Sequence, residues 1–223
     1  MKLLVSDFDG TFFLEGVEKD LKAIEDWRKV GNLFVIATGR SYYDYKIKEQ
    51  KYKIPTDFII LNHGATILYK DEIIYNKTID DNIVKEITKI KVKEVYCCRF
   101  KESRTSINNK DITKIVLKFD NEKETEIIKN KLMKKYNNDL NVYLLSNKKT
   151  LEIVSKNANK YFAIEFLKKK INFQEIIVIG NGKTDVEMIK NYDGYCVSNS
   201  CLDVKEVCKK EYSSVYELIN DKI

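Results

Sequence analysis

Four short apolar runs constrain the fold of this chain more than any other feature of its sequence. They occupy residues 3–5, 33–37, 58–61 and 176–179, and no polar residue interrupts any of them. Uninterrupted apolar runs are typical of strands that a parallel sheet buries on both faces. Stretches with helical spacing separate the first three runs, so the sequence predicts an open α/β sheet with right-handed crossovers and helices on both faces.

The stretches between the first three runs fit amphipathic helices. Over residues 17–30, apolar residues recur every three or four positions and form one apolar face: Val17, Leu21, Ile24, Trp27 and Val30. A second helix is expected over residues 41–50, with Ser41 as its N-cap, because a Ser hydroxyl can accept a hydrogen bond from a backbone N–H of the first turn.

The middle of the chain has a different pattern. A hairpin is expected over residues 66–75, and residues 78–151 then fit the order helix, two strands, helix, and one or two strands. The strands of this segment are amphipathic, as in an antiparallel sheet: residues 94–100, 112–119 and 141–145. Cys97 and Cys98 are adjacent in the first of them, so we expect one to face each side of that strand.

The α/β pattern resumes after residue 151. The expected elements are a helix over 159–170, a strand over 176–179, a helix over 185–190, a strand over 195–197 and a helix over 203–210. We therefore predict one α/β domain made of residues 1–77 and 152–223, with residues 78–151 inserted as a small α+β domain.

Composition and charge favour a soluble, cytoplasmic protein. No apolar run approaches the roughly 20 residues of a membrane-spanning helix, and Asp7 and Asp9 lie too early for a secretory signal. The five cysteines include no C-x-x-C pair, which argues against a zinc site. The net charge of +6 arises between residues 76 and 150, where acids are interspersed with the lysines. We therefore expect neither nucleic acid nor a membrane as a partner, and the oligomeric state is left open.

Two acidic residues, Asp7 and Asp9, directly follow the first apolar run. Residues i and i+2 of an extended chain point the same way, so both carboxylates are expected on one side while Phe8 turns toward the core. They lie beyond the carboxyl end of a parallel strand, where open α/β sheets bind ligands. Because two such carboxylates repel each other, either one is protonated or a cation lies between them. An ordinary polar turn is the alternative.

Three other segments supply groups that bind phosphate at equivalent positions. The second run ends in Thr38, Gly39 and Arg40, which offer a hydroxyl, a backbone N–H and a cation. Residues 180–185 follow the fourth run with further oxygen donors, and Lys160 lies at the start of a predicted helix. Each segment alone also fits an ordinary turn, an N-cap loop or a solvated lysine, but together they favour one phosphate site.

These segments resemble the motifs of haloacid dehalogenase superfamily phosphatases, in the Cof-like branch whose cap lies between the second and third motifs. Residues 7–11 match the D-x-D-G-T motif, and residues 38–40 match the T-G-R motif. Lys160 matches the lysine of the third motif, and residues 180–185 match the final G-D-G-x-N-D motif. The resemblance covers nearly the whole chain and implies a Rossmann-like parallel-sheet core with the inserted segment as the cap.

The resemblance also implies an activity, a cofactor and roles for individual residues. The expected reaction is Mg²⁺-dependent hydrolysis of a small phosphorylated metabolite, a sugar phosphate or phosphorylated cofactor, through an aspartyl-phosphate. The nucleophile is Asp7, the general acid and base is Asp9, and Lys160 is the third catalytic residue. The expected phosphate or substrate ligands are Thr38, Gly39, Arg40, Asn62 and His63, and the expected metal ligands are Asp7, Asp9, Asn181 and Asp185.

Three residues depart from the family pattern. Asn181 stands where Asp is usual and Thr184 where Asn is usual, so metal binding is expected to rely more on Asp185. His63 replaces an asparagine, and as the only histidine it fits either a catalytic role or a turn that contacts substrate or solvent. A phosphomutase, a phosphoacceptor signalling domain and a non-catalytic phosphate-binding or regulatory protein remain alternatives, with nucleic-acid binding last.

Overall fold

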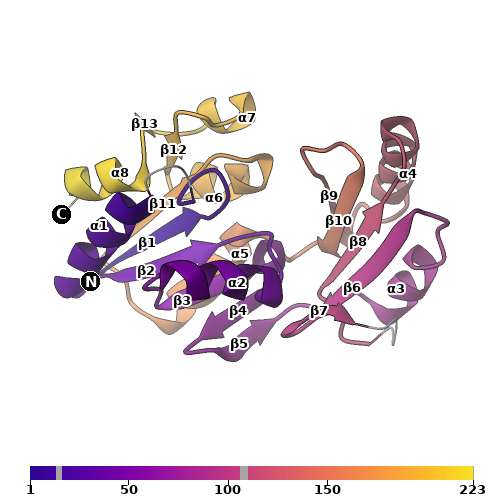
Figure 1. Cartoon of the computed structure of the whole chain (residues 1–223), viewed down its shortest axis with the longest axis horizontal. Coiled ribbons are helices and arrows are strands. Elements are labelled where there is room, and N and C mark those ends of the chain that lie inside the picture. Colours follow the sequence, from indigo (N-terminus) through magenta and orange to yellow (C-terminus); the bar gives the residue numbers. More distant parts are fainter. Residues whose placement is uncertain (14–16, 106–109, 223) are drawn as a thin grey trace.

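The computed structural model describes residues 1–13, 17–105 and 110–222, which contain two sheets (Figure 1). The main sheet has the strand order β13-β12-β11-β1-β2-β3-β4-β5. Its strands are β1 (Lys2–Asp7), β2 (Leu33–Ala37), β3 (Phe58–Leu61), β4 (Thr66–Tyr69), β5 (Glu72–Asn76), β11 (Glu175–Gly180), β12 (Tyr195–Val197) and β13 (Glu211–Tyr212). From β13 to β3 all neighbours are parallel, whereas β4 and β5 pair antiparallel.

Helices cover both faces of the main sheet, as alternate residues of β1 make clear. The side chain of Leu4 packs in a cluster with α1 (Val17–Lys29), α2 (Tyr42–Tyr52) and α8 (Val215–Lys222). Leu3 and Val5 point the other way, into a cluster with α5 (Lys160–Lys170), α6 (Val186–Asn191) and α7 (Leu202–Lys205). Both faces are apolar because both are buried, and the predicted α/β fold class is confirmed.

The second sheet is antiparallel, with the strand order β7-β6-β8-β10-β9. Its strands are β6 (Glu94–Arg99), β7 (Glu102–Thr105), β8 (Lys114–Lys118), β9 (Leu140–Leu144) and β10 (Thr150–Ser155). Two helices, α3 (Asp81–Ile87) and α4 (Glu122–Lys135), pack on one face through a cluster that includes Cys97, Ile115 and Ile153. The second sheet lies beside the β4–β5 end of the molecule (Figure 1).

Neither α3 nor α4 packs on the opposite face of the second sheet, which presents different residues. Strand alternation puts Cys98 there, since Cys97 belongs to the cluster on the helical face, and the expectation for this cysteine pair is confirmed. Lys114 lies directly across from Cys98, and Glu152 lies directly across from Tyr143. This face is called the helix-free face below.

Two expectations near the ends of elements are wrong, and one helix was missed. Val30 is 62% exposed and lies outside the apolar face of α1. The helix predicted over 203–210 is only the short α7, because the chain beyond it pairs with the sheet: Lys209 N donates to Gly194 O at 2.8 Å, and Cys196 N donates to Lys210 O at 3.2 Å. The terminal helix α8 was not predicted.

The chain passes between the two sheets twice, from β5 to α3 and from β10 to α5. The boundary expected between residues 151 and 152 falls inside β10, and the division into a split domain and an inserted domain stays a prediction. Within the described residues, no helix is both long enough and apolar enough to cross a membrane.

Candidate active site

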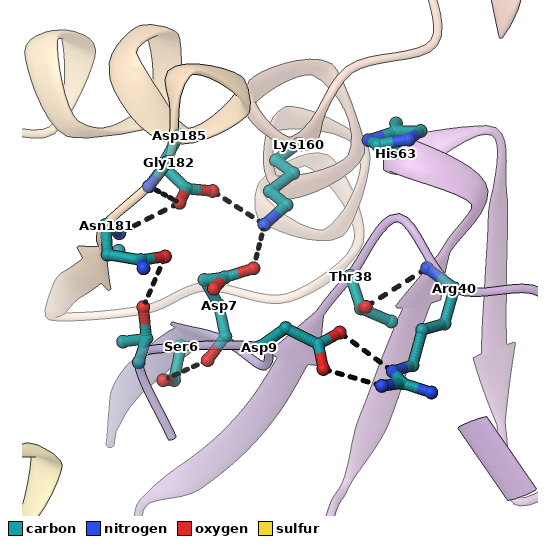
Figure 2. Close-up of polar contacts among 12 residues, drawn as sticks. Ser6, Asp7, Asp9, Thr38, Arg40, His63, Lys160, Asn181, Gly182 and Asp185 are labelled. Carbon is teal, nitrogen blue, oxygen red and sulfur yellow. Dashed lines mark hydrogen bonds and ion pairs between the residues drawn. The ribbon is translucent and has the colours of Figure 1, made fainter. Parts of the chain in front are cut away.

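The carboxyl ends of three neighbouring strands bring the expected residues to one edge of the main sheet (Figure 2). Strand β1 lies between β11 and β2, and it ends at Asp7. Thr38 follows the end of β2, and β11 ends at Gly180. The carboxyl ends of neighbouring parallel strands lie at the same edge of a sheet, so residues far apart in the sequence meet here.

Lys160 joins two carboxylates at the centre of this edge. Its Nζ donates to Asp7 Oδ1 at 2.5 Å and to Asp185 Oδ1 at 2.6 Å. Lys160 and Asp185 are each 1% exposed and Asp7 is 7% exposed, so water has little access to these charges. Lys160 opens α5, where Asn159 caps the helix by accepting from Phe162 N. A single ammonium group therefore serves two buried carboxylates.

This charge imbalance alters the protonation of the site. Burial, and then repulsion from Asp185, raise the pKa of Asp7 to about 7, although Lys160 opposes both effects. Burial alone would lower the pKa of Lys160, but attraction to Asp185 and Asp7 outweighs it and raises that pKa, so Lys160 stays charged. With both carboxylates ionised, the buried group would hold one more negative charge than its own cation neutralises, and a proton on Asp7 is favoured for this reason.

Asp9 has different surroundings from Asp7. Its carboxylate binds the guanidinium of Arg40 through two parallel hydrogen bonds, from Nε at 2.8 Å and from Nη2 at 2.7 Å. The Asp9 side chain is 50% exposed, and the hydrogen bond to it raises the pKa of Arg40. In the structure Lys160 contacts Asp7 and Arg40 contacts Asp9, and the expectation of a proton or a cation between the two carboxylates stays a prediction.

The turn after β11 is built around the second oxygen of Asp185. Asp185 Oδ2 accepts from the backbone N–H groups of Asn181 at 3.0 Å and Gly182 at 2.9 Å. A Cβ atom on Gly180 would lie 2.6 Å from the Asp185 side chain, so this close approach requires glycine. Asn181 Oδ1 accepts from the Thr11 hydroxyl at 3.1 Å, which ties this turn to the segment after β1.

Thr38, Gly39 and Arg40 form a turn beside Asp9. Thr38 is buried, and its hydroxyl accepts from Arg40 N at 3.1 Å. The short 3₁₀ turn at Asn62–Gly64 is joined to this turn by two backbone hydrogen bonds. His63 N donates to Thr38 O at 3.0 Å, and Asn62 N donates to Arg40 O at 2.9 Å. The expected phosphate-binding residues therefore lie in two backbone segments that hold each other.

The side chains of Asn62 and His63 have partners on the second sheet. Asn62 Nδ2 donates to the Thr113 hydroxyl at 3.4 Å, and His63 Nε2 lies 2.5 Å from Glu152 Oε2. The expectation that His63 contacts solvent is wrong, because the residue is only 5% exposed. Burial lowers the pKa of His63 even against the pull of Glu152, so the ring is neutral at pH 7 and its Nε2–H donates to the carboxylate.

Two residues of this region, Lys114 and Glu152, were not singled out by the sequence. Lys114 Nζ donates to Gly39 O at 2.7 Å and to Glu152 Oε1 at 2.8 Å. In the sequence both are ordinary charged residues in amphipathic strands, and only the pairing of β8 with β10 places them together on the helix-free face. Strand alternation would have found them once that pairing was known.

The site offers oxygen donors suited to a hard cation. In the described part of the chain, no three His, Cys, Asp or Glu side chains are grouped to hold a metal ion. Two carboxylates, Asp7 and Asp185, nevertheless share one ammonium, and Asn181 Oδ1 retains a second lone pair beyond its bond to Thr11. Oxygen ligands with an unneutralised charge fit Mg²⁺ in kind.

Together these groups can carry out phosphoryl transfer. A buried carboxylate next to an ammonium can attack, a second carboxylate two residues on can exchange protons, and backbone N–H and hydroxyl groups can bind phosphate oxygens. The fold and the order of these groups along the sheet edge define the class, and the expectation of a haloacid dehalogenase superfamily phosphatase of the Cof-like branch is confirmed.

The chain belongs to the sucrose-6F-phosphate phosphohydrolase family, whose model matches residues 1–216. A haloacid dehalogenase-like hydrolase from B. subtilis shares 18% identity and has a TM-score of 0.83, with all of both chains covered. The sucrose-phosphatase of Synechocystis sp. PCC6803, solved with sucrose and phosphate, shares 15% identity, has a TM-score of 0.72, and is matched over 98% of this chain and 95% of that one.

A curated relative from Mycoplasma capricolum is 38% identical over 93 residues. That match spans 37% of this chain and 34% of the relative, so the chain covers about a third of the length of that protein. The chain is a phosphoric monoester hydrolase by family.

Proposed function

We propose that this protein hydrolyses the phosphate monoester of a small metabolite with Mg²⁺, through a phosphoryl group carried on Asp7. The observation that carries the proposal is the contrast between two aspartates two residues apart. Asp7 is buried against Lys160, whereas Asp9 is half exposed and paired with Arg40. A buried carboxylate beside a fixed ammonium suits attack on phosphorus, and an accessible one suits proton exchange with substrate and water.

In the first half-reaction, an oxygen of Asp7 forms a bond to phosphorus as the bond from phosphorus to the leaving oxygen breaks. Asp9 gives its proton to that leaving oxygen, which departs as an alcohol. Both oxygens of the Asp9 carboxylate accept a hydrogen bond from Arg40. Asp9 must therefore release Arg40 before it can carry that proton. The phosphate dianion of the substrate is the natural competitor for the guanidinium.

In the second half-reaction, water attacks the phosphorus of the aspartyl-phosphate and Asp9 takes up its proton. The phosphorus–oxygen bond to Asp7 breaks, which regenerates the carboxylate and releases inorganic phosphate. Lys160, the Thr38 hydroxyl and the Gly39 N–H hold phosphate oxygens throughout, and this work is mostly positioning and electrostatics. Asp9 paired with Arg40 is the proton acceptor this step needs.

The ligands of Mg²⁺ in this proposal are Asp7, the backbone of Asp9, Asp185 and Asn181. The ion supplies positive charge that allows an anionic nucleophile to approach an anionic phosphate. The raised pKa of Asp7 supports this assignment. Burial and repulsion from Asp185 favour a positive charge at the Asp7 carboxylate, and without a further cation a proton supplies it.

The substrate class we propose is a sugar phosphate, with phosphorylated cofactors as the second possibility. Support comes from the family name and from the Synechocystis structure, which holds sucrose and phosphate. The second sheet, as a cap over the site, would exclude water and select the leaving group. Asn62 and His63 lie between the site and this cap, and their contacts suit a role at that boundary.

Phosphate release from a generic aryl phosphate, with Mg²⁺ and with EDTA, tests the activity. We expect many turnovers with Mg²⁺ and background rates with EDTA. No phosphate release at all would favour the non-catalytic phosphate-binding protein suggested by Asn181. Release of one equivalent of the aryl alcohol, with the phosphoryl group left on the protein, would favour a phosphoacceptor domain. A panel of sugar phosphates, in which isomerised product rather than free phosphate would indicate a phosphomutase, then tests the substrate class.

A further inference from the structure

Two charged side chains of the second sheet reach the turn that carries Arg40. Lys114 and Glu152 lie on the helix-free face, and their side chains are 3% and 12% exposed. Lys114 Nζ donates to Gly39 O of the main-sheet edge at 2.7 Å, and also to Glu152 Oε1 at 2.8 Å. The other oxygen of Glu152 accepts from His63 Nε2. A cation, an anion and a neutral ring thus join the two sheets through a water-poor contact.

The charges of this group stay fixed across the physiological pH range. Burial opposes the charged form of Glu152, but Lys114 and His63 outweigh it and lower its pKa to about 2. Burial likewise opposes the charge on Lys114, and Glu152 outweighs it and raises that pKa. His63 is neutral, as shown above. Because Lys114 and Glu152 keep each other charged and burial favours the neutral His63 ring, the group fits a permanent mechanical link better than a pH switch.

The link ends on one particular peptide bond. The carbonyl that Lys114 holds belongs to Gly39, and the N–H of the same peptide belongs to Arg40 and donates to the Thr38 hydroxyl. This peptide is therefore held at both ends, by a residue of the second sheet and by a residue of the main sheet.

The ring of His63 limits the remaining freedom of that peptide. A Cβ atom on Gly39 would lie 2.4 Å from the Cε1 atom of His63, so the ring lies directly against the glycine. The orientation of the peptide sets the direction in which the Arg40 side chain leaves the backbone. That side chain then reaches Asp9 through its two hydrogen bonds.

We propose that Lys114, Glu152 and His63 are positioning residues that fix the Gly39–Arg40 peptide and thereby hold Arg40 against Asp9. The contact between the two sheets then affects the geometry of Asp9, the proton-transferring carboxylate. The catalytic consequence rests on the proposed function, whereas the positioning itself does not. None of the three residues needs to touch the reacting atoms.

Amide hydrogen exchange at Arg40, measured by NMR on the full chain without ligand, tests the positioning directly. Lys114→Met removes the donor to Gly39 O, and Glu152→Gln removes the negative charge that orients Lys114 with little change of shape. We expect exchange of the Arg40 amide to accelerate roughly 10-fold or more in both variants, since charge-assisted hydrogen bonds are lost. Lys114→Arg keeps a donor and should restore much of the protection.

Lys118→Met is the matched control. Lys118 lies four residues further along β8 and pairs with Glu94 at 2.7 Å within the second sheet. Its loss should leave exchange at Arg40 unchanged. Equal exchange in wild type, Lys114→Met and Glu152→Gln would overturn the proposal, and so would an acceleration as large in Lys118→Met. If Lys114→Met does not fold, Glu152→Gln decides.

The same variants, assayed with an aryl phosphate, separate this inference from the proposed function. We expect kcat/KM to fall roughly 10-fold in Lys114→Met, because Arg40, which pairs with Asp9 and in the proposed function also meets the substrate phosphate, loses its position. Accelerated exchange in a wild-type protein that releases no phosphate would leave the positioning standing and remove the proposed function. Unchanged exchange in an active enzyme would do the reverse.

Discussion

Asp7 and Asp9 lie two residues apart at the end of β1 and have opposite surroundings. Asp7 shares Lys160 with a second buried carboxylate, and its pKa is raised to about 7. Asp9 is half exposed and pairs with the guanidinium of Arg40, which also donates to the backbone O of Asp44. The difference teaches that one short motif can supply two chemically distinct carboxylates, because their partners come from different parts of the chain: Lys160 opens α5, and Arg40 follows β2.

The largest expected effect comes from Asp7→Asn. An amide cannot attack phosphorus, so we expect turnover of an aryl phosphate to fall to background while the fold is kept. Phosphate release and thermal denaturation check the two parts. Thermal stability should not drop, since the substitution removes a charge from an acidic buried group that already favours a proton. Retained activity in a folded Asp7→Asn protein would remove Asp7 from the role of nucleophile.

Asp9→Asn should have the next largest effect. Loss of a positioned general acid and base typically costs about 10²–10⁴-fold in rate, and both half-reactions need this residue. We expect kcat to fall within that range, measured with an aryl phosphate at saturating Mg²⁺. A loss of only a few fold would assign the proton transfer to another group and erase the functional contrast between the two aspartates.

Loss of Lys160 should lower the free energy of unfolding much more than loss of Arg40. Lys160→Met leaves two buried carboxylates without a partner, and breaking a buried pair costs about 3–5 kcal/mol. Arg40→Met breaks an accessible pair, which is worth about 1 kcal/mol or less. Urea unfolding of both variants at pH 7 measures the difference in the free energy of unfolding. Equal losses would contradict the contrast in burial between the two ion pairs.

The smallest effect concerns Glu152, a buried carboxylate with more favourable partners than Asp7. Its pKa in the folded protein is lowered to about 2 from 4.5, so its contribution to stability is fully present above about pH 5 and is lost as the pH falls toward 2. Glu152→Gln should therefore be less stable than wild type at pH 7 and approach it in acid. The change is about 3 kcal/mol at most, and urea unfolding between pH 2 and pH 7 follows it. A stability difference that does not narrow in acid would show that Glu152 is not held as an anion.

Much of the main sheet was predictable because its signals are local. The apolar runs over 33–37 and 58–61 coincide with β2 and β3, since strands buried on both faces leave an unbroken apolar pattern. Asp7, Thr38 and Gly180 lie at one edge, as expected of residues that end parallel strands. The length of α7 was not predictable, because it ends where the chain pairs with β12, which is a long-range contact.

The sequence by itself determined which residues line the edge of the sheet, because hydrophobic periodicity and the ends of strands are encoded over a few neighbouring positions. Only the tertiary structure decided what each of them meets there. Lys160 reaches Asp7 across 153 positions of sequence, and Lys114 reaches Gly39 across 75. Burial, charge pairing and hence pKa depend on such distant neighbours, and these are brought together by strand order and packing rather than by any local pattern.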